Sequence, residues 1–301
     1  MLNTIVVQST DELHGAVLDA MQKDGHKADL NHIDVSSIRV FDGLFSNSQF
    51  EGDISKWNMG RAISVDGMFR DCPFTGDISN WNMQNVESAK SMFMRSGFSG
   101  DISRWNVRKL EVANHMFYMS PFNGDISKWD VRALTHAIGM FEGSEFSGDV
   151  SSWRPTLLAH SKGMFMTPAF HGDLSEWQLP RFGHHTNLVH STFTGMLPDM
   201  NVDNPFEVYG SMLGNTARLH LYAARTPFSL VHADMLLANP EGCRWATPEM
   251  IQWAQEHKSM GSALGLAKAQ LRAMMVRQQI GFPEEPVGLT EALLESSLHS
   301  P

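Results

Sequence analysis

The chain has little of what marks disulfide-bonded, membrane-spanning or nucleic-acid-binding proteins. Only two cysteines, Cys72 and Cys243, occur among 301 residues, which excludes a disulfide framework. No apolar run approaches the ~18 residues of a membrane span, and the N-terminus has neither the basic start nor the apolar core of a secretory signal. Positive charge is also scarce: 23 Lys and Arg stand against 33 Asp and Glu, a net charge of −10, so nucleic acid is not the expected partner.

These absences predict a cytoplasmic or leaderless chain without membrane insertion, and they leave a surface, translocated or virion location open. Glycine-rich phosphate loops and the HExxH and GxSxG motifs are missing as well. We therefore expect no enzyme activity and no cofactor.

What the sequence has in abundance is one octet. "FEGDISKW" at residues 50–57 is followed by "FTGDISNW", "FSGDISRW", "FNGDISKW", "FSGDVSSW" and "FHGDLSEW", each 24 residues after the last. A variant copy, "ADLNHIDVS", precedes them from Asp29. Self-similarity at a fixed period predicts a repeat architecture in which each copy buries its apolar face only by stacking on its neighbours.

Within the octet, two columns are predicted to form a structural ladder. An aliphatic residue follows each Asp, a Trp comes three residues later, and a Val or Met two further on, which is the L-x-x-L-x-L frame of leucine-rich repeats. In that frame the Trp points inward from a short parallel strand, and a return arm with Met-Phe pairs such as Met68-Phe69 packs against it. The ladder consists of Asp53, Asp77, Asp101, Asp125, Asp149 and Asp173 with Trp57, Trp81, Trp105, Trp129, Trp153 and Trp177.

The glycine before each Asp is expected to turn the chain with a positive φ, and the carboxylate to accept backbone N–H groups at that corner. Calcium binding is the alternative for the Asp column. It is disfavoured, because each repeat offers one carboxylate and no second ligand column.

The pattern "MFxxSxFNGDISxWxV", with its leading "ADLNHIDVS", resembles the BspA-like leucine-rich-repeat family, also described as the mycoplasma-lipoprotein type. The resemblance covers residues 29–177. It implies a right-handed solenoid in bacterial proteins, often surface-exposed, that serves adhesion or partner binding rather than catalysis.

The predicted fold class is therefore an α/β repeat, a leucine-rich-repeat-like parallel β-solenoid with an N-terminal strand–helix cap and a C-terminal helical domain. Residues 1–28, with the strand-like "TIVVQS" and the helical "DELHGAVLDAMQKDG", would form the cap. Residues 29–196 would form the solenoid. Residues 197–301, where Thr247 and Pro248 begin a helical pattern, would form the helical C-terminal cap or domain.

Variable polar residues flank each Trp on the predicted outward side of the strand. In a leucine-rich solenoid this is the concave binding face, so we expect a basic patch that engages a protein partner of acidic character. The alternative is that these residues are only solvated. The predicted partner-binding residues are Lys56, Asn82, Arg104, Asn106, Arg108, Lys128, Arg132 and Arg154.

A histidine column, His136, His160 and His184, is the one candidate for a metal site. Zinc sites usually add Cys or carboxylate ligands at close spacing, and this array offers neither, so no metal is expected.

Taken together, these features predict a non-enzymatic protein-interaction module, used for binding, adhesion or as a scaffold. Two alternatives remain open. One is a translocated effector or enzyme whose activity lies in the C-terminal helical domain, with the solenoid as a targeting module; the other is a structural component of a phage or particle.

Overall fold

The computed structural model describes residues 4–180, 184–190, 193 and 198. All belong to the first of two compact units, which comprises Met1–Met200 with Met212–Gly214. Apart from Pro198, the predicted helical domain over residues 197–301 lies outside the described residues.

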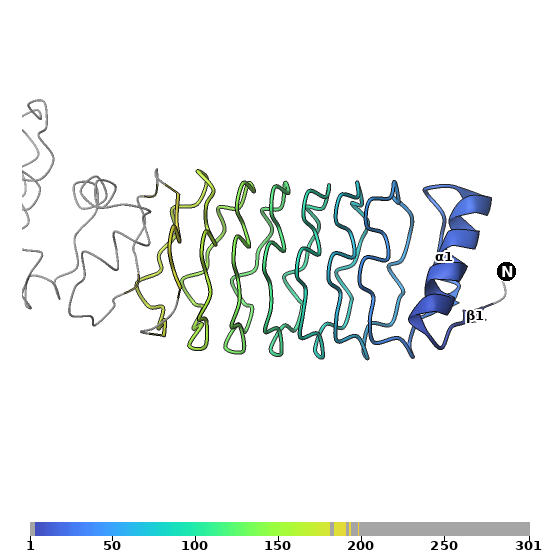
Figure 1. Cartoon of the computed structure of the whole chain (residues 1–301), viewed down its shortest axis with the longest axis horizontal. Helices are drawn as coiled ribbons and strands as arrows, with labels where there is room; N and C mark the ends of the chain where they lie inside the picture. The colour runs from blue at the N-terminus through green and yellow to red at the C-terminus, as the bar shows by residue number, and fades with distance from the viewer. Residues whose placement is uncertain (1–3, 181–183, 191–192, 194–197, 199–301) are drawn as a thin grey trace, which may run out of the picture. The chain divides into compact units, whose positions relative to one another are not determined.

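The N-terminal segment contains a strand and a helix where the sequence predicted them. Strand β1 (Ile5–Val6) pairs in parallel with β2 (Ile33–Asp34), and helix α1 (Thr10–Asp24) lies between them in sequence. Ser9 caps α1 by accepting the N–H of Glu12, and the helix ends at Gly25, where φ is 78°. Leu13, Val17 and Ala20 form the buried face of α1, which lies beside the first coil (Figure 1).

Beyond α1 the chain runs as a row of similar coils (Figure 1). Residues 24 apart lie side by side in successive coils, joined by single parallel bridges from Val40 to Ser64, from Ser64 to Ser88, and onward to His184. Within the described residues, β1 and β2 are the only strands of two residues or more.

The strand predicted around each Trp is wrong. Residues 55–56 form a turn, closed by the N–H of Trp57 donating to the Ile54 carbonyl at 3.1 Å. The Asp53 carboxylate accepts the N–H of Ser55 at 2.9 Å, which curls the backbone here instead of extending it. Apart from the bridge between Asp29 and Asp53 at the first octet, the inter-coil bridges lie on the other arm of the coil, the predicted return arm.

On the return arm the backbone N–H groups alternate between two directions. Those of Gly67 and Phe69 donate to carbonyls of the next coil at 2.7 and 2.9 Å, whereas those of Met68 and Arg70 bond back within their own coil. In most coils, two residues of this arm that lie four positions apart adopt a left-handed backbone conformation. One such column holds Gly43, Gly67, Gly139 and Gly163 with φ of 56–66°, and in the same column Ser91 and His115 each have a φ of 55°.

The octet glycines are explained differently from the prediction. None of the six, all of which are described, has a positive φ. A Cβ added at Gly76 would instead lie 2.6 Å from the ring of Phe74, and one at Gly148 would lie 2.8 Å from the ring of Phe146. Glycine is therefore required because the octet Phe folds its ring over the residue two positions later.

Two phenylalanine columns fill the centre of every coil. The return-arm rings stack on one another at about 5.6 Å, as Phe69 does on Phe93, and each also stacks on the octet ring of its own coil, as Phe69 does on Phe74 at 4.2 Å. These rings are fully buried. Because each ring contacts neighbours in both directions, the core is continuous along the described coils.

The tryptophans join the coils on the octet side. Each indole N–H donates to the carbonyl of the aliphatic residue 27 positions earlier, in the preceding coil, at 3.0–3.2 Å. Ile78 illustrates the arrangement, because its carbonyl accepts both the backbone N–H of Trp81 and the indole N–H of Trp105. Within the described residues, no backbone hydrogen bond joins residues 74–83 to residues 98–107.

Trp105→Phe is expected to lower the free energy of unfolding by about 1–3 kcal/mol, because the indole bond to the Ile78 carbonyl is lost and the smaller ring leaves part of the buried site empty. Urea denaturation followed by circular dichroism measures the change. Met116→Leu, also in the core, keeps side-chain volume without touching this bond and should cost less than about 1.5 kcal/mol. A Trp105→Phe chain as stable as the wild type would refute the role assigned to the indole.

Ser91→Gly is expected to stabilise the protein by about 1 kcal/mol, because it removes a Cβ from a left-handed position where the preceding coil has Gly67. The matched control is Gly67→Ser in the same column, where an added Cβ has open space and meets only the Arg70 Cβ at 3.8 Å. It should lower the melting temperature. Shifts of the same sign for both variants would contradict this account.

Candidate functional site

The predicted partner-binding residues lie in three adjacent columns around the tryptophans. Seven of the eight are exposed, and Arg154 is half-buried. Because residues 24 apart are neighbours in the stack, Arg104 lies next to Lys128, Asn82 next to Asn106, and Arg108 next to Arg132. Lys56 is separated from Arg104 by the intervening coil, which carries Asn80 at that position.

Two of the basic side chains are already paired within the chain. Arg132 binds Asp130 through two hydrogen bonds of 2.6 and 2.8 Å. Arg154 lies 3.5 Å from Glu176 and donates to the Ser151 and Trp153 carbonyls at 2.9 Å. Arg104, Arg108 and Lys128 make no ion pair within the described residues. Lys56 makes none either, so the unpaired positive charge of the surface lies on these three neighbouring residues and on Lys56 two coils away.

The two asparagines have a local structural role that the sequence analysis did not foresee. The Asn82 side-chain carbonyl accepts the N–H of Gln84 at 3.2 Å, and that of Asn106 accepts the N–H of Arg108 at 3.3 Å. Their carbonyls therefore fix the turn after each Trp. Only their amide N–H₂ groups remain to donate to a partner.

The Asp column borders this surface, and its carboxylates stabilise the turn before each Trp. Each octet carboxylate accepts the N–H of the Ser two residues later at 2.8–2.9 Å. This bond lowers the pKa values of Asp53, Asp77, Asp101, Asp125 and Asp149 below the ordinary value. The positive charges of Arg104 and Lys128 also lower the pKa values of Asp101 and Asp125, by a smaller amount. Acidic and basic side chains thus lie close together on this surface.

The histidine column forms a stack. The rings of His136 and His160 lie 4.4 Å apart with an interplanar angle of 16°, and those of His160 and His184 lie 5.2 Å apart. Since imidazole lone pairs lie in the ring plane, stacked rings direct their nitrogens side by side instead of toward a common point. Burial and then the neighbouring histidines lower the pKa of His160. Among the described residues, no group of three or more His, Cys, Asp or Glu side chains could hold a metal ion.

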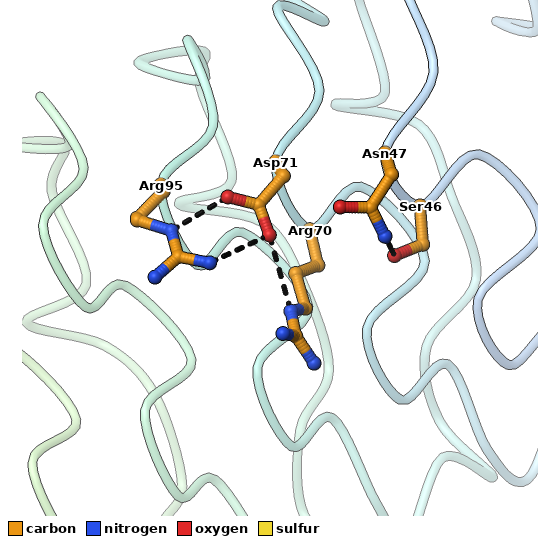
Figure 2. Close-up of polar contacts among 5 residues, drawn as sticks. All are labelled: Ser46, Asn47, Arg70, Asp71 and Arg95. Atoms are coloured by element: carbon orange, nitrogen blue, oxygen red, sulfur yellow. Dashed lines mark hydrogen bonds and ion pairs between the residues drawn. The ribbon is translucent and has the colours of Figure 1, made fainter.

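Two clusters were missed by the sequence analysis. A shallow groove beside the predicted surface is lined by Arg39, Arg61, Ile63, Asn85, Glu87 and Lys109. On the return arm, Asp71 binds Arg95 at 2.6 and 2.8 Å and Arg70 at 3.2 Å (Figure 2). The opposite charges of Asp71 and Arg95, 24 residues apart, were the signal that could have revealed the second cluster.

Comparison with known proteins gives one match. A family model described as a Mycoplasma protein of unknown function, DUF285, matches residues 15–121 and 96–194. No curated protein and no solved structure matches the chain. In the part of the chain that the structure describes, no helix has both the length and the apolar character needed to cross a membrane.

Asp77→Asn is expected to destabilise the chain at pH 6, because a neutral amide accepts the Ser79 N–H more weakly than a carboxylate does. The pKa of Asp77 is lowered in the folded state, so its stabilising contribution is present above the ordinary value of 3.8 and is lost as the pH falls through the lowered value. Urea denaturation of both chains at pH 6, 4 and 3 should show the difference closing toward pH 3. A difference that stays constant would contradict this assignment.

Proposed function

Because the chain belongs to the family of Mycoplasma proteins of unknown function DUF285, a BspA-like repeat type, we propose that it is a non-enzymatic protein-interaction module. Its coils would form a leucine-rich-repeat-like parallel β-solenoid. The variable columns around the tryptophans would form its binding face, in an adhesion or scaffold role.

One observation carries the proposal: core positions repeat, whereas exposed positions beside them vary. Every octet Trp is 1–4% exposed and unchanged from coil to coil. The residue immediately before it differs in charge and size, and in chain order it is Lys56, Asn80, Arg104, Lys128, Ser152 and Glu176. A row of variable side chains on a repeated scaffold is how repeat proteins build extended recognition surfaces.

The charge of this row favours an acidic protein partner. Arg104, Arg108 and Lys128 are exposed cations without an ion-pair partner in the described residues, on a chain of net charge −10. Arg39, Arg61 and Lys109 in the neighbouring groove extend the basic area, with Glu87 as the one carboxylate of its lining. Such local complementarity would steer association and fix its orientation.

The triple variant Arg104→Glu/Arg108→Glu/Lys128→Glu is expected to lose partner binding at least tenfold. The immobilised full-length chain would be used to capture proteins from the native organism, with quantification by mass spectrometry. The matched control Lys23→Glu/Lys90→Glu/Lys162→Glu makes the same change of charge at exposed positions elsewhere and should retain the partner. Equal recovery by both triple variants would refute the proposal.

A further inference from the structure

A second exposed surface, on the return arm, holds side chains where the backbone favours glycine. The column concerned contains Asn47, Asp71, Arg95, Met119 and Gly143, with φ between 50° and 68°. Asn and Asp tolerate this left-handed conformation, and Gly adopts it freely. Arg95 and Met119 do neither, so their presence places strain on the backbone.

The fold does not require these two side chains. The N–H groups of Arg95 and Met119 donate to carbonyls of the next coil at 2.8 and 2.9 Å, and Gly143 makes the equivalent bond to Met166 at 3.0 Å without any side chain. Glycine thus satisfies the same backbone geometry one coil further along.

The contacts of the Arg95 and Met119 side chains do not offset the backbone strain either. The Met119 residue is 55% exposed, and its Cγ lies over Gly143, 3.1 Å from where a Cβ at that glycine would stand. The Arg95 side chain is 43% exposed, so solvent screens its bidentate ion pair with Asp71, which is the one contact that a glycine here would lose to Asp71. Strained residues whose side chains face solvent are more often kept for what they bind than for the fold.

The surroundings of these residues have the composition of a protein interface. Arg70 and Arg95 share the single carboxylate of Asp71, which leaves one positive charge unbalanced in this cluster (Figure 2). Next along the stack, the Tyr118 ring meets His115 edge-on at 5.6 Å, and Met119 follows it in sequence. Arg, Tyr and Met are the residue types enriched at protein interfaces.

We propose that Arg70, Arg95, Tyr118 and Met119 form a second docking surface, which binds a protein segment carrying an apolar side chain beside a carboxylate. Met119 and the Tyr118 ring receive the apolar side chain, and the unbalanced guanidinium receives the carboxylate. This surface lies on the other arm of the coil from the columns around the tryptophans, so it is independent of the face assigned above.

The test uses a random dodecapeptide library displayed on phage and selected on the immobilised full-length chain, with the Arg95→Gly/Met119→Gly variant for subtraction. Enriched peptides are expected to combine an Asp or Glu with a neighbouring apolar residue. A synthetic copy should bind the wild type at least tenfold more tightly than the double variant, and its Asn or Gln analogue should lose the same factor. Peptides that bind both chains equally, or that lack a carboxylate, overturn the proposal.

Three further measurements test the backbone strain, the independence of the two surfaces and the identity of the partner. The double variant should melt at the same or a higher temperature than the wild type, because glycine relieves the backbone strain at both left-handed positions. A lower melting temperature would show that contacts of the two side chains offset this strain, and would overturn the proposal. The Arg104→Glu/Arg108→Glu/Lys128→Glu chain should still bind the peptide. If this chain no longer binds it, the two surfaces are not independent. Sedimentation showing a dimer that the double variant abolishes would assign the surface to a second copy of this chain instead.

Discussion

Each coil is tied to the one before it by a hydrogen bond from a buried indole. The Asp-Ser turn curls the octet segment, so the backbone N–H groups of its Ser and Trp bond within their own coil. The first octet pairs with residues 26–30, but among the described residues no backbone bond joins one octet to the next. The aliphatic carbonyl then accepts twice, from its own turn and from the next indole. A buried carbonyl with both lone pairs satisfied, and a large ring stacked beside it, explain why this position is always Trp.

The two arms of a coil therefore hold the stack together through different kinds of hydrogen bond. On the return arm, backbone hydrogen bonds join neighbouring coils and left-handed positions accompany them. On the octet side, beyond the first octet, the indole side chains join them. The exposed side chains that join neighbouring coils, such as Arg95 with Asp71 and Asn123 with Ser147, differ from one coil to the next. Those positions are free to change from coil to coil, and both of the surfaces that we propose for partner binding lie among them.

The sequence revealed the stack's period, its buried columns and a corner carboxylate that accepts a backbone N–H, as Asp77 accepts that of Ser79, because all of these follow from spacing and local chemistry. It misplaced the strand, because the L-x-x-L-x-L frame does not disclose the turn that the Asp carboxylate induces. It misread Gly76, whose neighbour Phe74 covers it only in three dimensions. Pairing of Arg132 with Asp130 and of Arg154 with Glu176 required side-chain geometry, as did the sharing of Asp71 by two arginines.

The most direct test of this account is hydrogen–deuterium exchange of the indole N–H groups, followed by nuclear magnetic resonance with each signal assigned by single Trp→Phe replacement. The account predicts strong protection for Trp57, Trp81, Trp105, Trp129, Trp153 and Trp177, because each indole N–H is buried and bonded to the preceding coil. Exchange of these six signals at the rate of a free indole would contradict it.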